Sequence, residues 1–172
     1  MGSFKTTFSF STTSPENTKA DAVIVPVFQP KKKDTGKSKS KATENFKLPT
    51  ALKALNTALQ GIMEKAANEE KFTGAKGSLL VFRKTPSDKV LATRIIIVGL
   101  GPEDKLRADR IESAFTTALS NATKLKNPGT IAITLPKEVK ALKSDAVIKN
   151  IVDAVHQTTY RSEEARDPGP KI

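Results

Sequence analysis

Two long apolar runs constrain the fold of this chain more than any other feature of its sequence. One is AVIVPVF at Ala22–Phe28, and the other is VLATRIIIVG at Val90–Gly99. The first is apolar on both of its faces, whereas a strand with one solvated face alternates apolar and polar side chains. Strands that are apolar on both faces are typical of a sheet covered by helices on both sides. Pro26 predicts that the first run has no partner along one edge or carries a bulge, because proline lacks the backbone N–H.

Periodicity supplies the remaining predicted elements. Their order implies crossover connections between parallel strands plus one antiparallel hairpin. We therefore expect an α/β fold with three layers, a mixed sheet with helices on both faces. The expected strands cover residues 4–10, 22–28, 78–84, 90–99 and 130–136, and the expected helices cover residues 49–66, a long stretch after the glycine turn at 99–101, and 144–160.

Positive charge is concentrated in one segment. The 172-residue chain has a formal net charge of +11, and Lys31–Lys47 holds seven lysines against two acids. This segment has no apolar period, so we expect a mobile surface loop. Lysines of this kind bind phosphates weakly and lose affinity as salt rises. The predicted contacts for non-specific nucleic acid are Lys31, Lys32, Lys33, Lys37, Lys39 and Lys41.

The sequence argues against membrane spans, against cysteine chemistry, and against catalytic or metal sites built from its histidine or acids. The chain has no cysteine, and no run approaches the roughly 20 apolar residues that span a bilayer, so we expect a cytoplasmic protein without membrane contact. His156, the only histidine, lies at the margin of a helical apolar stripe and is interpreted as a packing residue. The acids are interpreted as solvated, and we predict no catalytic, cofactor-binding or metal-binding residue. These acids are Glu69, Glu70, Glu103, Asp104, Glu163 and Glu164.

The stretch RIIIVGLGPEDKL resembles a phosphate-binding turn, because Gly99 and Gly101 follow an apolar strand. A dinucleotide fingerprint needs a third glycine, and Asp104 occupies that position. Two acids also stand where phosphate would bind, although acids favour the first turn of a helix. We therefore interpret this stretch as a buried strand, a glycine corner and an acidic helix start. GAKGS at Gly74–Ser78 similarly lacks the spacing of a P-loop.

Three blocks taken together resemble the N-terminal domain of the leucyl aminopeptidases, the cytosol aminopeptidase family M17. FSFSTTSPENTKADAVIVPVFQ is similar to the first strand pair of the family. KFTGAKGSLLVFRKTPSDKVLATRIIIVGLG is similar to its Phe-x-Gly-x-x-Gly entry, hairpin and Val-Gly-x-Gly strand end. EDKLRADRIESAFTTALSNA resembles the helix that follows.

The resemblance implies a macro-domain-like fold ahead of a separate catalytic domain. In the family that second domain carries two divalent metals (Zn or Mn), removes N-terminal residues from peptides and assembles as a hexamer. Its marker, Asn-Thr-Asp-Ala-Glu-Gly-Arg, is absent from this sequence, so no catalytic or metal residue is carried over. We expect a first strand pair in residues 1–30, the lysine-rich loop in 31–48, the rest of one domain in 49–161, and an interdomain linker or tail in 162–172.

Three functions remain open at this point. The chain is a noncatalytic domain of an aminopeptidase with a structural, assembly or regulatory role, or it is a stand-alone macro-like module that binds ADP-ribose, or it binds nucleic acid through its lysines. The acids beside Gly101 argue against a bound phosphate. Only Phe46 lies near enough to the lysines to stack on a base, which argues against specific nucleic-acid recognition.

Overall fold

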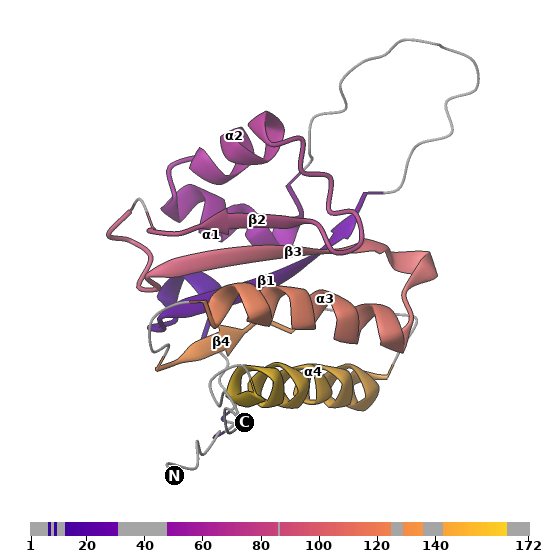
Figure 1. Cartoon of the computed structure of the whole chain (residues 1–172). Coiled ribbons are helices and arrows are strands. Elements are labelled where there is room, and N and C mark those ends of the chain that lie inside the picture. The colour runs from indigo at the N-terminus through magenta and orange to yellow at the C-terminus, as the bar shows by residue number, and fades with distance from the viewer. Residues whose placement is uncertain are drawn as a thin grey trace, which may run out of the picture.

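The strands form one mixed four-stranded sheet between two layers of helices (Figure 1). The computed structural model describes Thr7, Ser9 and residues 13–30, 48–85, 87–124, 129–135 and 143–164. The strand order is β2-β3-β1-β4, and the helices cover both faces, which confirms the predicted three-layer α/β architecture. The strands are β1 (Ala22–Gln29), β2 (Leu79–Phe82), β3 (Arg94–Pro102) and β4 (Ile131–Ile133); the helices are α1 (Lys53–Ala58), α2 (Ile62–Glu69), α3 (Ala108–Ala122) and α4 (Ser144–Glu164).

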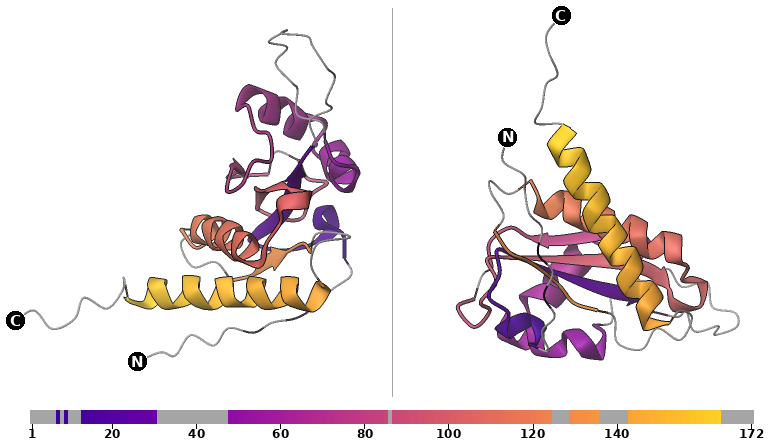
Figure 2. Two further views of the ribbon diagram at one scale, coloured as in Figure 1. Left: turned by 90° about the vertical axis from the view of Figure 1, so that its right-hand side faces the viewer. Right: turned by 90° about the horizontal axis from the view of Figure 1, so that it is seen from below.

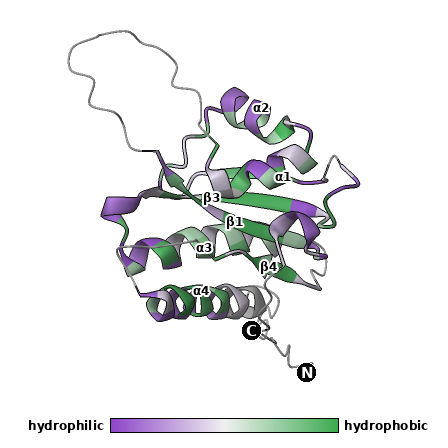
Figure 3. Ribbon diagram, turned by 180° about the vertical axis from the view of Figure 1, so that it is seen from behind, coloured by the Kyte–Doolittle hydropathy of each residue, from purple (hydrophilic) through white to green (hydrophobic). Residues whose placement is uncertain are grey.

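The two apolar runs become neighbouring parallel strands in the middle of the sheet. β1 pairs with β3 in a register that sets Ile24 beside Ile96 and Val25 beside Ile97. Alternate side chains enter two separate cores, one with α1 and α2 and the other with α3 and α4. Burying an Ile or Val side chain stabilises the fold by about 1.5–3 kcal/mol. The hydrophobic strands between more polar helix surfaces are visible in Figure 3.

Pro26 lies where the strand has no partner on one side, as predicted. The carbonyl of Ile24 accepts a hydrogen bond from Thr134 N at 2.9 Å, so Ile24 and, two residues on, Pro26 direct their backbone groups toward the β4 side. The pairing of β1 with β4 ends at Ile24 in the described residues. The next bond of this parallel ladder would run from the N–H of residue 26 to Thr134 O, and Pro26 cannot donate it, which is consistent with the end of the pairing here. A register shift against β3 follows between Val27 and Gln29.

The single helix predicted over residues 49–66 is wrong, because the chain forms two helices with a break between them. A short 3-10 helix, η2 (Thr50–Leu52), leads into α1, and α2 begins at Ile62. Gln60 and Gly61 have positive φ, and their N–H groups donate to Thr57 O (3.0 Å) and Asn56 O (2.9 Å). This is the Schellman pattern that ends a helix.

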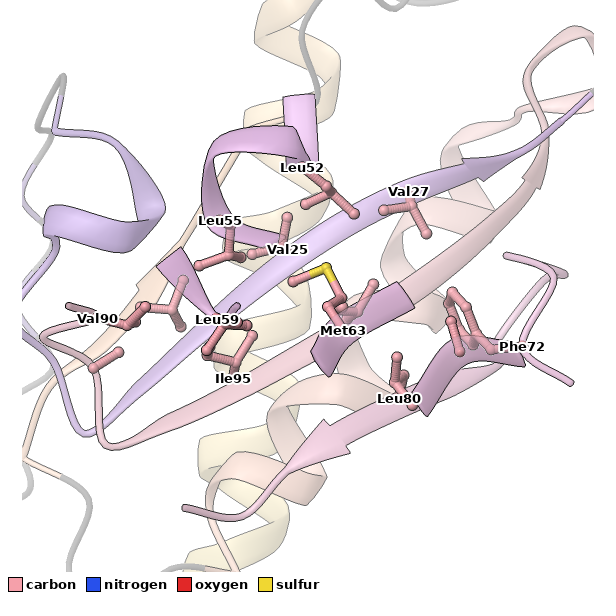
Figure 4. Close-up of a cluster of buried hydrophobic side chains, with 14 of the residues drawn as sticks. Val25, Val27, Leu52, Leu55, Leu59, Met63, Phe72, Leu80, Val90 and Ile95 are labelled. Carbon is pink, nitrogen blue, oxygen red and sulfur yellow. The ribbon is translucent and has the colours of Figure 1, made fainter. Parts of the chain in front are cut away.

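The two short helices still present one apolar surface to the sheet. Leu55, Leu59 and Met63 lie against Val25 and Ile95 in this core (Figure 4). Asn56 Oδ1 also accepts a hydrogen bond from the N–H of Glu64 at 3.2 Å, which links the end of α1 to the first turn of α2. The apolar period therefore survives the break that the sequence did not reveal.

The predicted antiparallel hairpin is confirmed, but its second strand is displaced. β2 pairs with β3 from Leu79 opposite Val98 to Phe82 opposite Ile95. β3 begins at Arg94 rather than Val90, because the backbone before it bonds to the N-terminal segment. Leu91 N donates to Glu16 O at 3.2 Å, and Glu16 belongs to the short 3-10 helix η1 (Pro15–Asn17). Thr93 N donates to Ala20 O at 3.1 Å.

The second core lies between the sheet, α3 and α4. Phe115 of α3 is fully buried, and α4 crosses beneath α3 with Val147, Ile151 and Ala154 buried against it (Figure 2). The helix predicted to end at Tyr160 continues to Glu164. β4 is shorter than predicted and only half-buried, because in the described part of the chain it pairs on one side alone. The strand predicted over residues 4–10 falls on a segment of which only Thr7 and Ser9 are described, so it stays a prediction.

Candidate functional site

The carboxyl ends of β1 and β3 form the edge of the sheet at which a ligand is expected to bind. Among the described elements, β1 is followed by α1 and α2 on one face of the sheet, and β3 is followed by α3 on the other. In open α/β sheets, ligands bind in the crevice that opens between neighbouring strands whose connections leave toward opposite faces. Gly99 and Gly101, the glycines of the candidate nucleotide turn, lie at this end of β3.

A short segment of the chain itself lies across this edge. We call residues 74–78 the glycine strap. Gly77 N donates to Gly99 O at 2.9 Å, Gly99 N donates to Ser78 O at 2.8 Å, and Gly101 N donates to Gly74 O at 3.0 Å. Ser78 Oγ closes the turn by donating to Ala75 O at 2.7 Å. The strap thus uses the backbone donors of both β3 glycines.

The strap approaches the strands so closely that side chains are excluded. A Cβ at Gly99 would overlap Ala75 O and Ser78 Oγ and would lie 2.6 Å from Gly74 C. A Cβ at Gly74 would lie 3.1 Å from Phe28 O at the end of β1. Gly74 also has φ +74°, a conformation that favours glycine. One glycine of each motif, Gly74 and Gly99, therefore serves the close contact between the strap and the strand ends.

This geometry corrects the interpretation of the glycine stretch in one respect. β3 continues through Gly99 and Gly101 to Pro102, so Gly99 lies within a strand. The acidic helix start is only a single 3-10 turn, η3 (Glu103–Lys105), and α3 begins at Ala108. Buried Leu106, in an extended conformation, separates the two helices. A dinucleotide site requires a helix whose free N–H groups come directly after the glycines. α3 does not meet this requirement, because η3 and Leu106 lie between it and Gly101.

The acids are dispersed rather than convergent. In the described part of the chain, no three Asp, Glu, His or Cys side chains form a group that could hold a metal ion. Glu69 forms an exposed ion pair with Lys65 at 4.0 Å, and Glu70 is exposed where α2 ends. Asp104 is exposed beside half-buried Glu103 in η3. A two-metal hydrolase needs several carboxylates directed at the same ions, and the described residues do not provide them.

Polar contacts on α4 link it to α3. Lys149 Nζ donates to Asp153 Oδ2 at 2.7 Å. This hydrogen bond and then the charge of Asp153 raise the pKa of Lys149 from its ordinary value of 10.5; partial desolvation opposes the shift, and Glu112 adds a smaller upward contribution. Glu112 of α3 also accepts a hydrogen bond from Gln157 of α4. His156 is exposed on α4, directly after half-buried Val155, and its interpretation as a boundary residue of this helix stays a prediction.

Asp21 is a residue whose role the sequence did not indicate. Its Oδ2 accepts hydrogen bonds from Gly129 N at 2.9 Å and Thr130 N at 2.7 Å, and so connects the start of β1 to the segment that enters β4. At the opposite end of the sheet from the strap, Arg94 Nε is buried, and none of the described residues forms a hydrogen bond with it. No local pattern around either residue marks these positions. Both belong to the amino ends of the strands, away from the candidate ligand edge.

A shallow open depression lies beside α1 and α2. It has a volume of about 400 Å³ and is lined by Leu48, Lys53, Asn56, Thr57 and Glu64. Asn56 Oδ1 and Thr57 Oγ1 both have partners within the helices. The depression is open to solvent, and its lining residues do not combine a nucleophile with a base or form a set of metal ligands.

The predicted nucleic-acid contacts lie outside the described residues. Lys31, Lys32, Lys33, Lys37, Lys39 and Lys41 all belong to residues 31–47, and their role stays a prediction. None of the helices that the structure describes is long and apolar enough to cross a bilayer.

Comparison with solved structures places the fold. The macrodomain of Mycobacterium tuberculosis DarG superimposes with a TM-score of 0.58 at 14% identity, over 87% of this chain and 90% of that one. A tomato leucine aminopeptidase variant superimposes with a TM-score of 0.54 at 21% identity, over 79% of this chain and 25% of that one. At these identities the likeness shows a macrodomain-like fold, which confirms the expected fold class.

Comparison with sequences gives the family. A probable cytosol aminopeptidase of Methylobacillus flagellatus is 28% identical over 90% of this chain, which spans 28% of that protein. Another, from Dechloromonas aromatica, is 31% identical over 65% of this chain and 19% of that protein. This chain therefore spans about a quarter of the length of these relatives. The sequence model of the cytosol aminopeptidase family, N-terminal domain, matches residues 24–168, and the chain belongs to this family as its N-terminal domain.

Proposed function

We propose that this chain is the noncatalytic N-terminal part of a leucyl aminopeptidase and acts in the structure, assembly or regulation of the longer enzyme. The observation that carries the proposal is coverage, since the chain spans 28% of a relative named as a cytosol aminopeptidase. The dispersed acids support it, because hydrolysis by metal-activated water needs ligands that the described residues do not bring together. In this proposal, two divalent ions (Zn or Mn) are held by a separate catalytic domain in the cytoplasm.

The reading frame downstream of residue 172 tests this arrangement. We expect it to encode a catalytic domain with the Asn-Thr-Asp-Ala-Glu-Gly-Arg marker. A stop codon directly after Ile172 would contradict the proposal and leave a stand-alone module. Light scattering on the longer protein would then test assembly: a mass of six subunits is expected, and a monomer would refute the proposed hexamer.

A second candidate is ADP-ribose binding, which the macrodomain-like fold makes worth testing. The glycine strap argues against it, because the strap already bonds to Gly99 and Gly101 where a phosphate would approach the strand ends. Titration calorimetry with ADP-ribose decides between the two. We expect no heat of binding, and micromolar affinity would reverse the ranking.

Weak nucleic-acid binding by the lysine-rich segment is the third candidate. We expect salt-sensitive affinity for random duplex DNA that falls when Lys31, Lys32 and Lys33 are changed to Ser. The matched control changes Lys65, Lys71 and Lys89 to Ser, which removes the same charge from exposed described positions. Equal affinity of the two triple variants would refute a role for the segment.

A further inference from the structure

The outer edge of β2 has backbone groups available for a further strand. β2 is the last strand of the sheet, at the end farthest from β4 (Figure 1), and among the described residues only β3 pairs with it. Gly99 N donates to Ser78 O, which makes Ser78 and Gly99 a hydrogen-bonded pair. Hydrogen-bonded pairs recur at every second residue of an antiparallel ladder. Leu80 and Phe82 therefore bond to β3, and Leu79 and Val81 direct their N–H and C=O groups outward.

The side chains of this edge are apolar and only half-buried. Leu79 and Val81 pack at the margin of the core that contains α3, and Phe82 packs at the margin of the other core. All three are partly accessible. An edge with free backbone groups and accessible apolar side chains on both faces can accept an extended segment by strand addition.

Positive charge flanks this edge at both ends. Lys76 precedes β2, and Arg83 and Lys84 follow it, and all three side chains are exposed. Between residues 71 and 89, five cations stand against the single acid Asp88. Gly101 lies close to Lys76, and in the described structure neither Glu103 nor Asp104, which follow in η3, forms an ion pair with Lys76.

This charge pattern selects between two occupants. In the antiparallel self-pairing that uses the outward groups of both copies, Leu79 of each copy lies opposite Val81 of the other. This pairing brings the Lys76 end of β2 in each copy near the Arg83 and Lys84 end in the other, and like charges brought together across a strand pair destabilise it. A second copy is therefore disfavoured, whereas a strand with acids at its two ends is complementary.

We propose that the outer edge of β2 binds an extended segment of another protein whose apolar centre is flanked by acids. The outward groups of Leu79 and Val81 supply four backbone hydrogen bonds. Lys76, Arg83 and Lys84 pair with the acids and fix the register. This inference does not rest on the proposed function, because it is argued from the described residues of this chain alone.

The test uses the whole chain and the fluorescein-labelled peptide Glu-Glu-Thr-Val-Thr-Val-Thr-Ser-Glu. Its valines fall opposite Val81 and Leu79, and its terminal acids lie toward Arg83 and Lys84 at one end and Lys76 at the other. Two control peptides replace the three acids by Lys or carry N-methyl groups on both valines. Fluorescence anisotropy gives the affinities, and NMR shifts of the Leu79 and Val81 amides locate the site.

We expect the acidic peptide to bind, with affinity that falls as salt rises, and the Lys peptide not to bind. N-methylation should weaken binding about tenfold, since two backbone hydrogen bonds are lost. Val81→Pro should weaken binding about 3–10-fold, because it removes one outward N–H and so one hydrogen bond to the peptide. The variant should still fold, because proline is tolerated on an edge strand when its N–H side faces outward. Arg83→Ser with Lys84→Ser should weaken binding, whereas Lys105→Ser with Lys124→Ser, which removes the same charge elsewhere, should not.

Three results would overturn the proposal. The first is no binding of the acidic peptide at about 1 mM protein, which would leave the cations only a role in keeping copies apart. The second is equal binding of the N-methylated peptide, which remains informative if Val81→Pro fails to fold. The third is a dimer in sedimentation velocity that Val81→Pro abolishes, because it would assign the edge to a second copy.

Discussion

Replacing Gly99 by alanine should destabilise the domain strongly, because the glycine strap leaves no room for a Cβ. The added carbon would overlap Ala75 O and Ser78 Oγ and lie 2.6 Å from Gly74 C. Overpacking of this kind costs about 1–3 kcal/mol. Displacing the strap also weakens the bonds from Gly77 N to Gly99 O and from Gly99 N to Ser78 O, at about 0.5–1.5 kcal/mol each.

Alanine gains back about 0.5–1 kcal/mol over glycine within a strand, so the expected net loss is about 1–5 kcal/mol. The free energy of unfolding is measured by urea denaturation. The matched control is Gly77→Ala in the same strap, where the Cβ meets open space and the loss is about 1–2 kcal/mol from the positive φ alone. If Gly99→Ala were no more destabilising than Gly77→Ala, the strap would not be packed on β3 as described.

Three further predictions concern single residues. Lys71 has φ +53° where α2 ends, so Lys71→Gly should raise the free energy of unfolding by up to about 1 kcal/mol, while Lys71→Ala should change it little; a loss of stability in the glycine variant would count against the assigned conformation. Asp21→Ala should cost about 1–3 kcal/mol and speed hydrogen exchange of the Gly129 and Thr130 amides, and unchanged exchange would contradict the bonding. Because Asp153 raises the pKa of Lys149, the ion pair stabilises the fold below pH 10.5 and this contribution is lost as the pH rises through the higher folded-state pKa. NMR titration should show the Lys149 pKa moving down toward 10.5 in Asp153→Asn, and an unchanged pKa would exclude the pair.

The sequence predicted the elements whose signal is local. The apolar runs of β1 and β3, the hairpin partner and the stripes of α3 and α4 all follow from periodicity, and Pro26 correctly marked the side of β1 without a partner. Each of these predictions depends only on the spacing of apolar side chains, which can be read directly from the sequence. The layer arrangement then follows from covering two-faced strands with helices.

The errors concern backbone conformation and hydrogen bonds, which the apolar pattern of the sequence does not encode. β3 was expected to end at Gly99, but the strap supplies the hydrogen bonds that extend it to Pro102. The break at Gln60 was hidden, because Leu59 and Met63 keep the helical period across it and Gln is a good helix former. The bonds of Asp21 to Gly129 and Thr130 join residues more than a hundred positions apart, and no local pattern encodes them.

The absence of a nucleotide at the glycine stretch stays a prediction, for which the sequence and the structure give different arguments. The sequence rejected a nucleotide at Gly99 and Gly101 because a third glycine is missing and acids follow. The structure adds a stronger argument, since the strap residues Gly74–Ser78 already bond to these glycines. A motif of glycines at loose spacing records close approach of backbone, and the approaching group can be the chain itself.

The most direct test of the central claim is a peptidase assay of this chain alone, with leucine p-nitroanilide and manganese. A noncatalytic domain predicts no release of p-nitroaniline beyond a blank that contains only the metal. Turnover that rises in proportion to the concentration of the chain, and that a chelator abolishes, would contradict the claim and require a metal site within these 172 residues.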